Sequence, residues 1–278
     1  MHCIINRKAE FSATHKYWLS DLSESDNADI HGHNYVLYVS LFGKIDQYGM
    51  LENLSYVKDV LKKEVINQLN YSYLNKIWPE FQQTLPSTEN IAKVIWQRLQ
   101  AHLPLCGVQL YKNPYLWADY RGIDMQASIT IKNHFSAAHR LALPHLSQNE
   151  NEAIYGKCAR VHGHGHNYHL EITVNGEIDP KTGMIVDLLA LQKVVNDLVV
   201  EPMDHTFLNF DIPHFQITVP TAENIALYIA QQLQAPVTTL GAKLERIKLI
   251  ESPNNSAEIL CNTLSSEFLQ AQQKVTVC

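Results

Sequence analysis

One cysteine and three histidines lie within nine residues of one another, in the stretch GKCARVHGHGHNY at positions 156–168. The alternating apolar run that follows predicts a β-strand beginning at about His166. Residues i and i+2 of a strand point to the same face, so His164 and His166 would lie side by side, and Gly165 leaves room between them. These residue types predict a metal bound at the start of a strand, next to a reactive thiol at Cys158.

The sequence contains a long internal repeat. Four short motifs occur twice in the same order: FSATH at 11–15 and FSAAH at 135–139, HGHNY at 31–35 and 164–168, GM at 49–50 and 183–184, and TEN at 88–90 and AEN at 222–224. The spacing between copies grows only once by more than one residue, from 124 to 133 positions. We interpret this pattern as a duplicated domain rather than a short-period solenoid. The second copy gains about nine residues between its two histidine motifs, and Cys158 lies in that longer segment.

Each copy is expected to fold as ββααββ, which makes the chain an α+β protein with an antiparallel sheet and two helices on one face of it. The predicted elements are strands 3–11 and 33–42, helices 51–69 and 88–102, and strands 108–111 and 115–120 in the first copy, and strands 126–135 and 166–174, helices 188–200 and 221–233, and strands 244–251 and 257–261 in the second. The predicted domains are residues 1–122 and 123–278. Residues 263–278 have no counterpart in the first copy, and we expect a short helix or a disordered tail there.

The composition excludes several classes of protein. The length of 278 residues suits two domains. A net charge of −6 argues against a nucleic-acid binder. No apolar run approaches the ~20 residues of a membrane span, and the first residues do not resemble a secretion signal. Five cysteines do not make a disulfide framework, so we expect free thiols and a cytoplasmic protein.

A third histidine precedes each HGH motif and completes a possible ligand set. His139, His164 and His166 would form this set in the second copy, and His15, His31 and His33 would form it in the first. Three histidines suit zinc, which keeps a fourth position open in catalytic sites. Two alternatives remain: the histidines are exposed residues of a polar loop, or His162 pairs with His164. We prefer the pair that aligns with the first copy, which leaves His162 at the rim of the pocket.

Other residues of the second copy have side chains suited to proton transfer or substrate binding. Asp204 and His205 are adjacent, and a carboxylate beside an imidazole can share a proton. Glu251 ends an apolar strand, where it would either bind a guanidine-like edge with two hydrogen bonds or simply face solvent. Glu223 lies in the first turn of a predicted helix, a position that the helix dipole favours for a carboxylate.

Taken together, these motifs resemble the 6-pyruvoyl-tetrahydropterin synthase family, which includes the 6-carboxytetrahydropterin synthases of queuosine biosynthesis. The resemblance extends over nearly the whole second half, where the motifs occur in the family's order: FSAAH at 135–139, GKC at 156–158, HGHNY at 164–168, DPKTGM at 179–184, DH at 204–205, TAEN at 221–224 and Glu251. It implies two tandem tunnelling-fold (T-fold) domains, in an assembly with active sites at subunit interfaces.

The resemblance also implies a function and a role for each residue. The enzyme would be a zinc-dependent lyase that converts 7,8-dihydroneopterin triphosphate to a 6-substituted tetrahydropterin. The implied roles are zinc ligands at His139, His164 and His166, the base at Cys158, a proton relay at Asp204 and His205, a pterin anchor at Glu251, and pocket-lining residues at Thr221 and Glu223.

The first half keeps the zinc histidines but departs from the family elsewhere. The segment carrying Cys158 is missing, with Ser25 and Asn27 at the candidate positions. Asn70-Tyr71 replaces the Asp-His pair, and Lys112 replaces Glu251. We therefore expect the first half to be a non-catalytic copy with a second, vestigial metal site.

The sequence leaves open the reaction product, the class of protein and the form of the oligomer. Cys158 to His164 has the spacing of 6-pyruvoyl enzymes, but Cys158 to His162 also satisfies that of 6-carboxy enzymes, which release acetaldehyde. A metal-dependent hydrolase that does not use Cys158, or a non-catalytic module that binds pterin or metal, would belong to other classes. We expect a homo-oligomer, with a trimer of chains favoured, in which three second halves form one ring and three first halves another.

Overall fold

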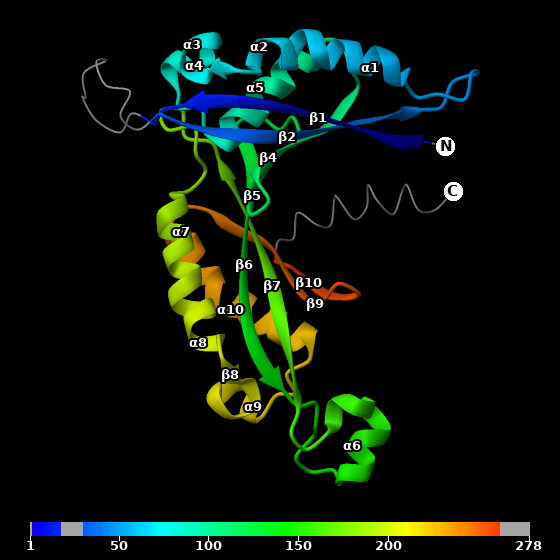
Figure 1. Ribbon diagram of the computed structural model, residues 1–278, viewed down its shortest axis with the longest axis vertical. Coiled ribbons are helices and arrows are strands. Elements are labelled where there is room, and N and C mark those ends of the chain that lie inside the picture. Colours follow the sequence, from blue (N-terminus) through cyan, green and yellow to red (C-terminus); the bar gives the residue numbers. More distant parts are fainter. Residues whose placement is uncertain (1, 18–29, 262–278) are drawn as a thin grey trace. The chain divides into compact units, whose positions relative to one another are not determined.

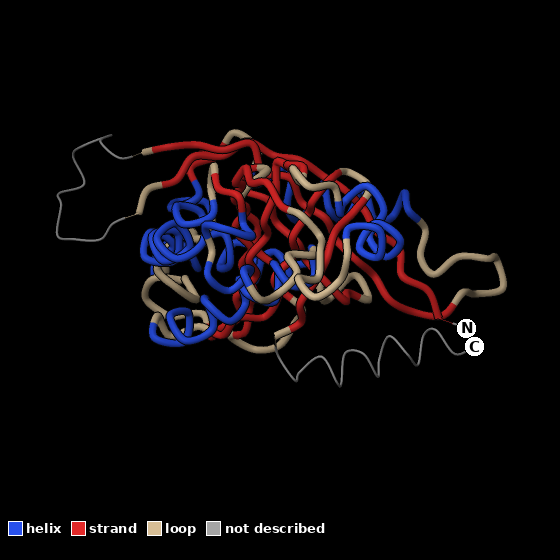
Figure 2. The backbone as a smooth tube through the Cα atoms, turned by 90° about the horizontal axis from the view of Figure 1, so that it is seen from below, coloured by secondary structure: helices blue, strands red, loops and turns tan. Residues whose placement is uncertain are grey.

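The computed structural model describes residues 2–17 and 30–261. Within these residues the chain forms two compact units. Unit 1 contains the chain up to Thr130 together with Asn175–Ile185, and unit 2 contains Ile131–Val174 and the chain from Val186 onward. Strands and helices occur in both units (Figures 1 and 2). The expectations for residues 263–278, and for Ser25 and Asn27, lie outside the described residues.

Unit 1 is built on strands in the order β5-β4-β2-β1-β3. The long strands β1 (His2–His15) and β2 (His31–Lys44) are antiparallel, with His15 opposite His31. β4 (Leu105–Asn113) and β5 (Leu116–Tyr120) form an antiparallel hairpin beside β2. The short strand β3 (Ser72–Tyr73) runs parallel to the end of β1.

The helices of unit 1 bury apolar side chains against this sheet. α1 (Leu54–Leu61) continues through a π-helical turn (Lys62–Ile66) into α2 (Asn67–Leu69), and α3 (Leu74–Ile77) and α4 (Glu80–Gln83) follow. α5 (Thr88–Leu99) packs on β4 and β5. The Ser87 hydroxyl caps α5 by accepting the Asn90 N–H, as expected for a serine at this position.

Unit 2 repeats this plan with the strand order β10-β9-β7-β6. β6 (Gln126–His139) and β7 (His164–Glu177) carry the second set of histidines, and β9 (Lys243–Ser252) and β10 (Asn255–Leu260) form an antiparallel pair. The two-residue strand β8 (Thr206–Phe207) runs parallel to the end of β6.

The helices of unit 2 follow the same order, with one addition. α7 (Leu188–Val195), a π-helical turn (Asn196–Val200) and α8 (Glu201–Met203) form one continuous stretch, followed by α9 (Leu208–Asp211), the 3₁₀ turn Pro213–Gln216 and α10 (Ala222–Thr239). α10 packs on β9 and β10. The addition is α6 (Gln148–Tyr155), with the 3₁₀ turn Gly156–Ala159, beyond the ends of β6 and β7 (Figure 1).

The predicted fold is confirmed, with corrections at the ends of elements. α10 continues past the predicted end at residue 233 to Thr239 and contains Pro236, although a proline inside a helix removes one backbone donor and crowds the preceding turn. The sequence interpretation missed the strands β3 and β8 and the short helices α3, α4, α6 and α9. Among the described residues, no helix is long and apolar enough to cross a membrane.

Candidate active site

Three histidines of unit 2 converge where β6 ends and β7 begins. His139 is the last residue of β6, and His164 and His166 open β7. One ring nitrogen from each lies within 4.8 Å of the others, so the three can hold one metal ion. The Nε2 atoms of His139 and His164 are 3.0 Å apart. His162 lies outside this group, on an exposed turn.

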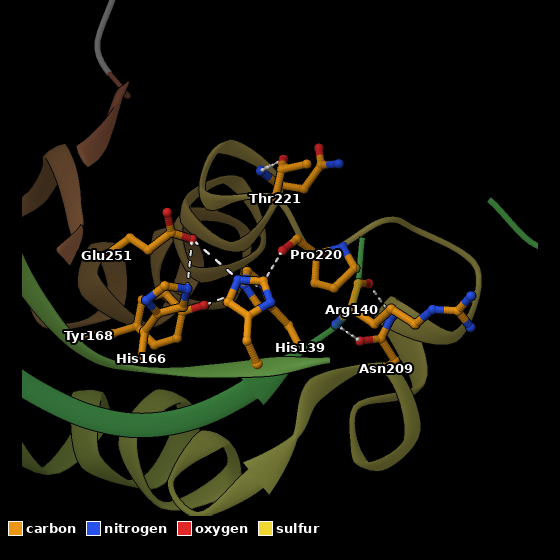
Figure 3. A network of polar contacts seen from close by, with 10 residues as sticks. His139, Arg140, His166, Tyr168, Asn209, Pro220, Thr221 and Glu251 are labelled. Atoms are coloured by element: carbon orange, nitrogen blue, oxygen red, sulfur yellow. Dashed lines mark hydrogen bonds and ion pairs between the residues drawn. The ribbon is translucent and has the colours of Figure 1, made fainter. Parts of the chain in front are cut away.

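His139 is oriented by a backbone carbonyl. Its Nδ1 lies 2.7 Å from the Pro220 oxygen, and the Tyr168 hydroxyl is 3.4 Å from the same nitrogen (Figure 3). Donation from Nδ1 to Pro220 leaves the Nε2 lone pair free for a metal. Burial lowers the pKa of His139 to about 4; the contact with Pro220 opposes this shift, and the neighbouring His164 and His166 add to it. His139 is therefore neutral at pH 7, the state that a ligand requires.

Glu251 faces the three histidines from the neighbouring strand. It lies near the end of β9, which is adjacent to β7 in the sheet. Its Oε1 is 3.7 Å from Nε2 of His166 and 3.8 Å from Nε2 of His139 (Figure 3). This carboxylate is mostly buried, with 16% of its side chain exposed. The solvated-strand-end interpretation of Glu251 therefore does not describe its position.

Cys158 lies in the 3₁₀ turn next to the histidines. Its carbonyl oxygen accepts the Leu141 N–H at 2.9 Å, which fixes the turn to the chain two residues after His139. Burial raises the pKa of Tyr168, and the negative charges of Glu251 and Cys158 raise it further. The thiol is thus close enough to Tyr168, itself beside His139, for their charges to interact. Cys158 is partly exposed and makes no disulfide.

Asp204 and His205 form a hydrogen-bonded pair on the edge of β6. The Asp204 Oδ2 and His205 Nδ1 atoms are 2.9 Å apart. Asp204 also accepts the Ser136 N–H at 2.7 Å, and this hydrogen bond, followed by that from His205, lowers the pKa of its carboxyl. His205 has a left-handed backbone, with φ 56°, and 84% of its side chain is exposed. In the described part of the chain, the side-chain polar contacts of the pair do not reach the histidine cluster.

Thr221 and Glu223 lie at the start of α10, next to Pro220. The Thr221 hydroxyl accepts the Asn224 N–H at 3.3 Å and caps the helix. Glu223 is exposed. Pro220 thus connects this helix end to the histidine cluster, through the contact that orients His139.

Two residues of this network were missed by the sequence interpretation, Tyr168 and Pro220. Tyr168 had a sequence signal, because it belongs to the repeated HGHNY motif. Its counterpart Tyr35 makes the corresponding contact in the first half, where its hydroxyl lies 3.1 Å from Nδ1 of His15. Pro220 acts only through its backbone oxygen, so no side-chain pattern could have identified it.

The first half contains a matching histidine cluster. Ring nitrogens of His15, His31 and His33 also lie within 4.8 Å of one another. Burial lowers the pKa of His15 to about 3 and that of His33 to about 4, with contributions from neighbouring histidines and Lys112. Lys112 therefore lies near the cluster where Glu251 lies in the second half, and it presents the opposite charge.

The backbone around the missing Asp-His pair is retained in the first half. Asn70 accepts the Ser12 N–H through Oδ1 at 2.9 Å, as Asp204 does with Ser136. Tyr71 takes the same left-handed backbone as His205, with φ 56°. The first half therefore keeps the geometry of the pair without its titratable groups.

Comparison with known proteins gives a consistent family assignment. The family model for 6-pyruvoyl tetrahydropterin synthase matches two segments of the chain, residues 4–123 and 128–261. A 6-pyruvoyl tetrahydrobiopterin synthase from Pongo abelii is 45% identical over 130 residues, which are 47% of this chain and 88% of that protein. A protein from Archaeoglobus fulgidus, named as a 6-carboxy-5,6,7,8-tetrahydropterin synthase, is 34% identical over 47% of this chain and 93% of its own.

Among solved structures, the 6-pyruvoyl tetrahydropterin synthase of Caenorhabditis elegans is similar to this chain. It is 35% identical, and the match covers 50% of this chain and 98% of the other, with a TM-score of 0.46.

Proposed function

Because the chain belongs to the 6-pyruvoyl tetrahydropterin synthase family, we propose that its second half is a zinc-dependent lyase acting on 7,8-dihydroneopterin triphosphate. The chain is a lyase-type enzyme like its named relatives. One observation supports the assignment to the second half above all others. There the three histidine nitrogens lie within 4.8 Å of one another and face the Glu251 carboxylate at 3.7 and 3.8 Å.

The residues of this cluster fit a zinc ion. Nε2 of His166 is buried and has no hydrogen-bond partner among the described residues, so a metal would satisfy it. Three neutral imidazoles are a common ligand set of catalytic zinc, which keeps a fourth position for the substrate. His139, His164 and His166 would hold the ion. When bound, zinc acts as a Lewis acid that acidifies the C–H bonds next to the substrate's side-chain oxygens.

The remaining side chains divide into a base, a relay and an anchor. Cys158 removes the acidified proton as a thiolate, and Asp204 and His205 return protons to the substrate. Glu251 binds the amino and ring N–H edge of the pterin with two charge-assisted hydrogen bonds. Thr221 and Glu223 line the same pocket. The exposed His205 supports a site that is completed where two chains meet.

The first half is a non-catalytic copy that retains a metal site. His15 Nε2 and His33 Nε2 are buried without partners among the described residues, as His166 Nε2 is in the second half. Lys112 carries hydrogen-bond donors and no acceptor, so it cannot bind the amino and ring N–H edge that Glu251 would accept. The full chain assembles as a homo-oligomer in the cytoplasm.

The product is a 6-pyruvoyl-tetrahydropterin, as the identity to 6-pyruvoyl tetrahydrobiopterin synthases favours. A 6-carboxytetrahydropterin, formed with release of acetaldehyde for queuosine biosynthesis, is the second candidate, supported by the Archaeoglobus relative. The test is to incubate the zinc-loaded chain with 7,8-dihydroneopterin triphosphate and to measure triphosphate, acetaldehyde and the mass of the pterin product. Acetaldehyde release would reverse the order of the two candidates, and no triphosphate release would leave only a non-catalytic pterin- or metal-binding module.

A further inference from the structure

A turn of the second half covers the start of a helix of the first half within unit 1. The turn is Asp179–Gly183, and the helix is α5. The Ser87 hydroxyl donates to the Gly183 oxygen, and the Thr84 hydroxyl donates to the Pro180 oxygen at 2.8 Å. Directly after the turn, the Ile185 N–H donates to Glu89 at 3.3 Å.

The contact is close enough to depend on a glycine. Gly183 has φ +70°, and a Cβ atom at this position would lie 2.6 Å from the Leu85 oxygen and 3.0 Å from the Asn90 Cβ. Ser87, Thr88, Glu89 and Asn90 are each at most 2% exposed. The first turn of α5 is therefore buried where Asp179–Gly183 packs against it.

The duplicated helix α10 begins with the same surface, which is more exposed in the part of the chain that the structure describes. Asn224 donates from Nδ2 to the Val219 oxygen at 2.8 Å, as Asn90 does to Leu85 at 2.9 Å. The capping hydroxyl of Thr221 corresponds to that of Ser87. Glu223, however, is exposed, whereas its counterpart Glu89 is fully buried.

The corresponding turn of the first half has the same backbone hydrogen bond, and its side chains are exposed. Asp46 donates its N–H to the Met50 oxygen at 2.8 Å, as Asp179 does to Met184 at 3.0 Å. Gly49 has φ +79°, yet among residues 2–17 and 30–261 no atom beyond its chain neighbours lies within 4 Å of a Cβ built on it. Ile45 and Tyr48 are 52% and 75% exposed. This turn has the shape of the docked one, although it is one residue shorter, and no described residue outside its own neighbours lies close to its glycine.

We propose that the turn Asp46–Met50 of one chain docks on the start of α10 in a second copy of the chain. The sequence retains each donor and acceptor of the intrachain contact. Thr218 corresponds to Thr84 and would donate to the Gln47 oxygen of the second copy. Thr221 would donate to the Gly49 oxygen, and Glu223 would accept the Leu51 N–H.

The occupant is a second copy because both surfaces belong to this chain and are duplicates of a pair already in contact. The arrangement places first halves next to second halves around the assembly. It differs in this respect from the rings of like halves expected from the sequence. The turn Asp179–Gly183, which a ring of second halves would need, is already engaged with α5.

Docking would complete the candidate active site, a consequence that rests on the proposed function. Pro220, whose oxygen orients His139, immediately precedes Thr221. The backbone of the docked turn would therefore form a wall of the pocket beside the metal ligands. Glu223 would hold the neighbouring chain in place at the wall of the same pocket.

The first experiment compares Gly49→Ala with Gly241→Ala. Both glycines have positive φ, and within the described residues neither has an atom beyond its chain neighbours within 4 Å of a built Cβ, so both substitutions strain the backbone of one chain similarly. Only Gly49→Ala would place a methyl group against the second copy. Light scattering of the full chain should give a multiple of 31.7 kDa for the wild type and Gly241→Ala, and at least a tenfold weaker association for Gly49→Ala. A monomeric wild type, or a Gly49→Ala variant that associates as the wild type does, would overturn the proposal.

A second experiment locates the contact. A chain carrying Gln47→Cys is mixed with a chain carrying Thr218→Cys, oxidised and digested, and the disulfides are mapped by mass spectrometry. A 47–218 disulfide joins two different chains, and we expect it to form. Its absence in an associating protein would show that the chains meet elsewhere. Neither experiment involves substrate, so a chain that shows the disulfide but no lyase activity would refute the proposed function alone.

Discussion

The imidazole of His139 donates its Nδ1 hydrogen to the carbonyl oxygen of Pro220 across 2.7 Å. Pro220 precedes the N-cap of α10, so one hydrogen bond joins the end of β6 to the start of a helix. The bond fixes both the tautomer and the direction of the ring, and Nε2 is left facing the other two histidines. A metal ligand held in this way loses little conformational freedom when it binds an ion.

We predict that the full chain binds about two zinc ions, one in each histidine cluster. His139→Ala and His15→Ala should each lose one zinc per chain, because a site with two histidines left loses its facial ligand set. Metal analysis after dialysis measures the content. Lowering the pH should release zinc only below the ordinary histidine pKa of about 6.5, since burial lowers the pKa of His139 and of His15.

His162→Ala is the matched control for this measurement. It removes the exposed histidine that could have paired with His164, and it should leave the zinc content unchanged. Loss of zinc in the His162→Ala variant would instead assign that histidine to the metal site.

We predict that Cys158→Ala lowers kcat by about 10²-fold or more, the usual contribution of a general base. Its zinc content should stay the same, because the thiol is not a member of the histidine cluster. Cys106→Ala, which alters a thiol of the first half, should be fully active. A Cys158→Ala variant with normal turnover would point to a metal-dependent hydrolase that activates water without the thiol.

We predict that Glu251→Gln raises KM about 10- to 100-fold, because it replaces charge-assisted hydrogen bonds with neutral ones. The effect on kcat should be smaller, since the anchor contacts the ring and not the reacting side chain. Glu177→Gln, at an exposed position at the end of β7, provides the control for a lost carboxylate. Steady-state kinetics with 7,8-dihydroneopterin triphosphate separate the two parameters, and an unchanged KM would remove Glu251 from the binding site.

The repeat made much of the fold predictable from sequence, because two copies of one hydrophobic pattern constrain the same set of elements. The missed helix α6 also had a signal. Ser147 and Glu150 form a capping box, and the serine and glutamate at that spacing were readable beforehand. The strand β8 had none, because two residues cannot show a period.

The site was predictable only where its chemistry lies in side chains close in sequence. The histidines and Cys158 fall into short motifs, whereas the contact between His139 and Pro220 joins residues 81 positions apart. The burial of Glu89 depends on Ile185, 96 positions away, and on a backbone N–H that carries no sequence signal. Glu89 and Glu223 therefore look equivalent in sequence, but one is buried and the other exposed.

We predict that Glu89→Gln makes the chain more stable above neutral pH. Burial raises the pKa of Glu89 from 4.5 to about 7, more than its hydrogen bonds with backbone and Ser87 lower it. The folded state therefore binds the proton more tightly than the unfolded state. The contribution of the protonated Glu89 carboxyl to the stability of the folded state is fully present below pH 4.5 and is lost as the pH rises through about 7. Glutamine has the shape of the protonated glutamate side chain and stays neutral at every pH. The variant should therefore avoid a loss of up to about 3 kcal/mol in the free energy of unfolding above neutral pH.

Urea unfolding at pH 5 and pH 8, followed by circular dichroism, measures this difference. The free energy of unfolding of the wild type, compared with that of Glu89→Gln, should be lower at pH 8 than at pH 5. Glu177→Gln is the control, because its carboxylate is exposed at the end of β7 and its removal should change the free energy of unfolding equally at pH 5 and pH 8. An equal difference in the free energy of unfolding between the wild type and Glu89→Gln at pH 5 and pH 8 would contradict the prediction. It would mean that Glu89 is ionised in the folded state at both values of pH, with Lys112 as the nearby cation that lowers its pKa.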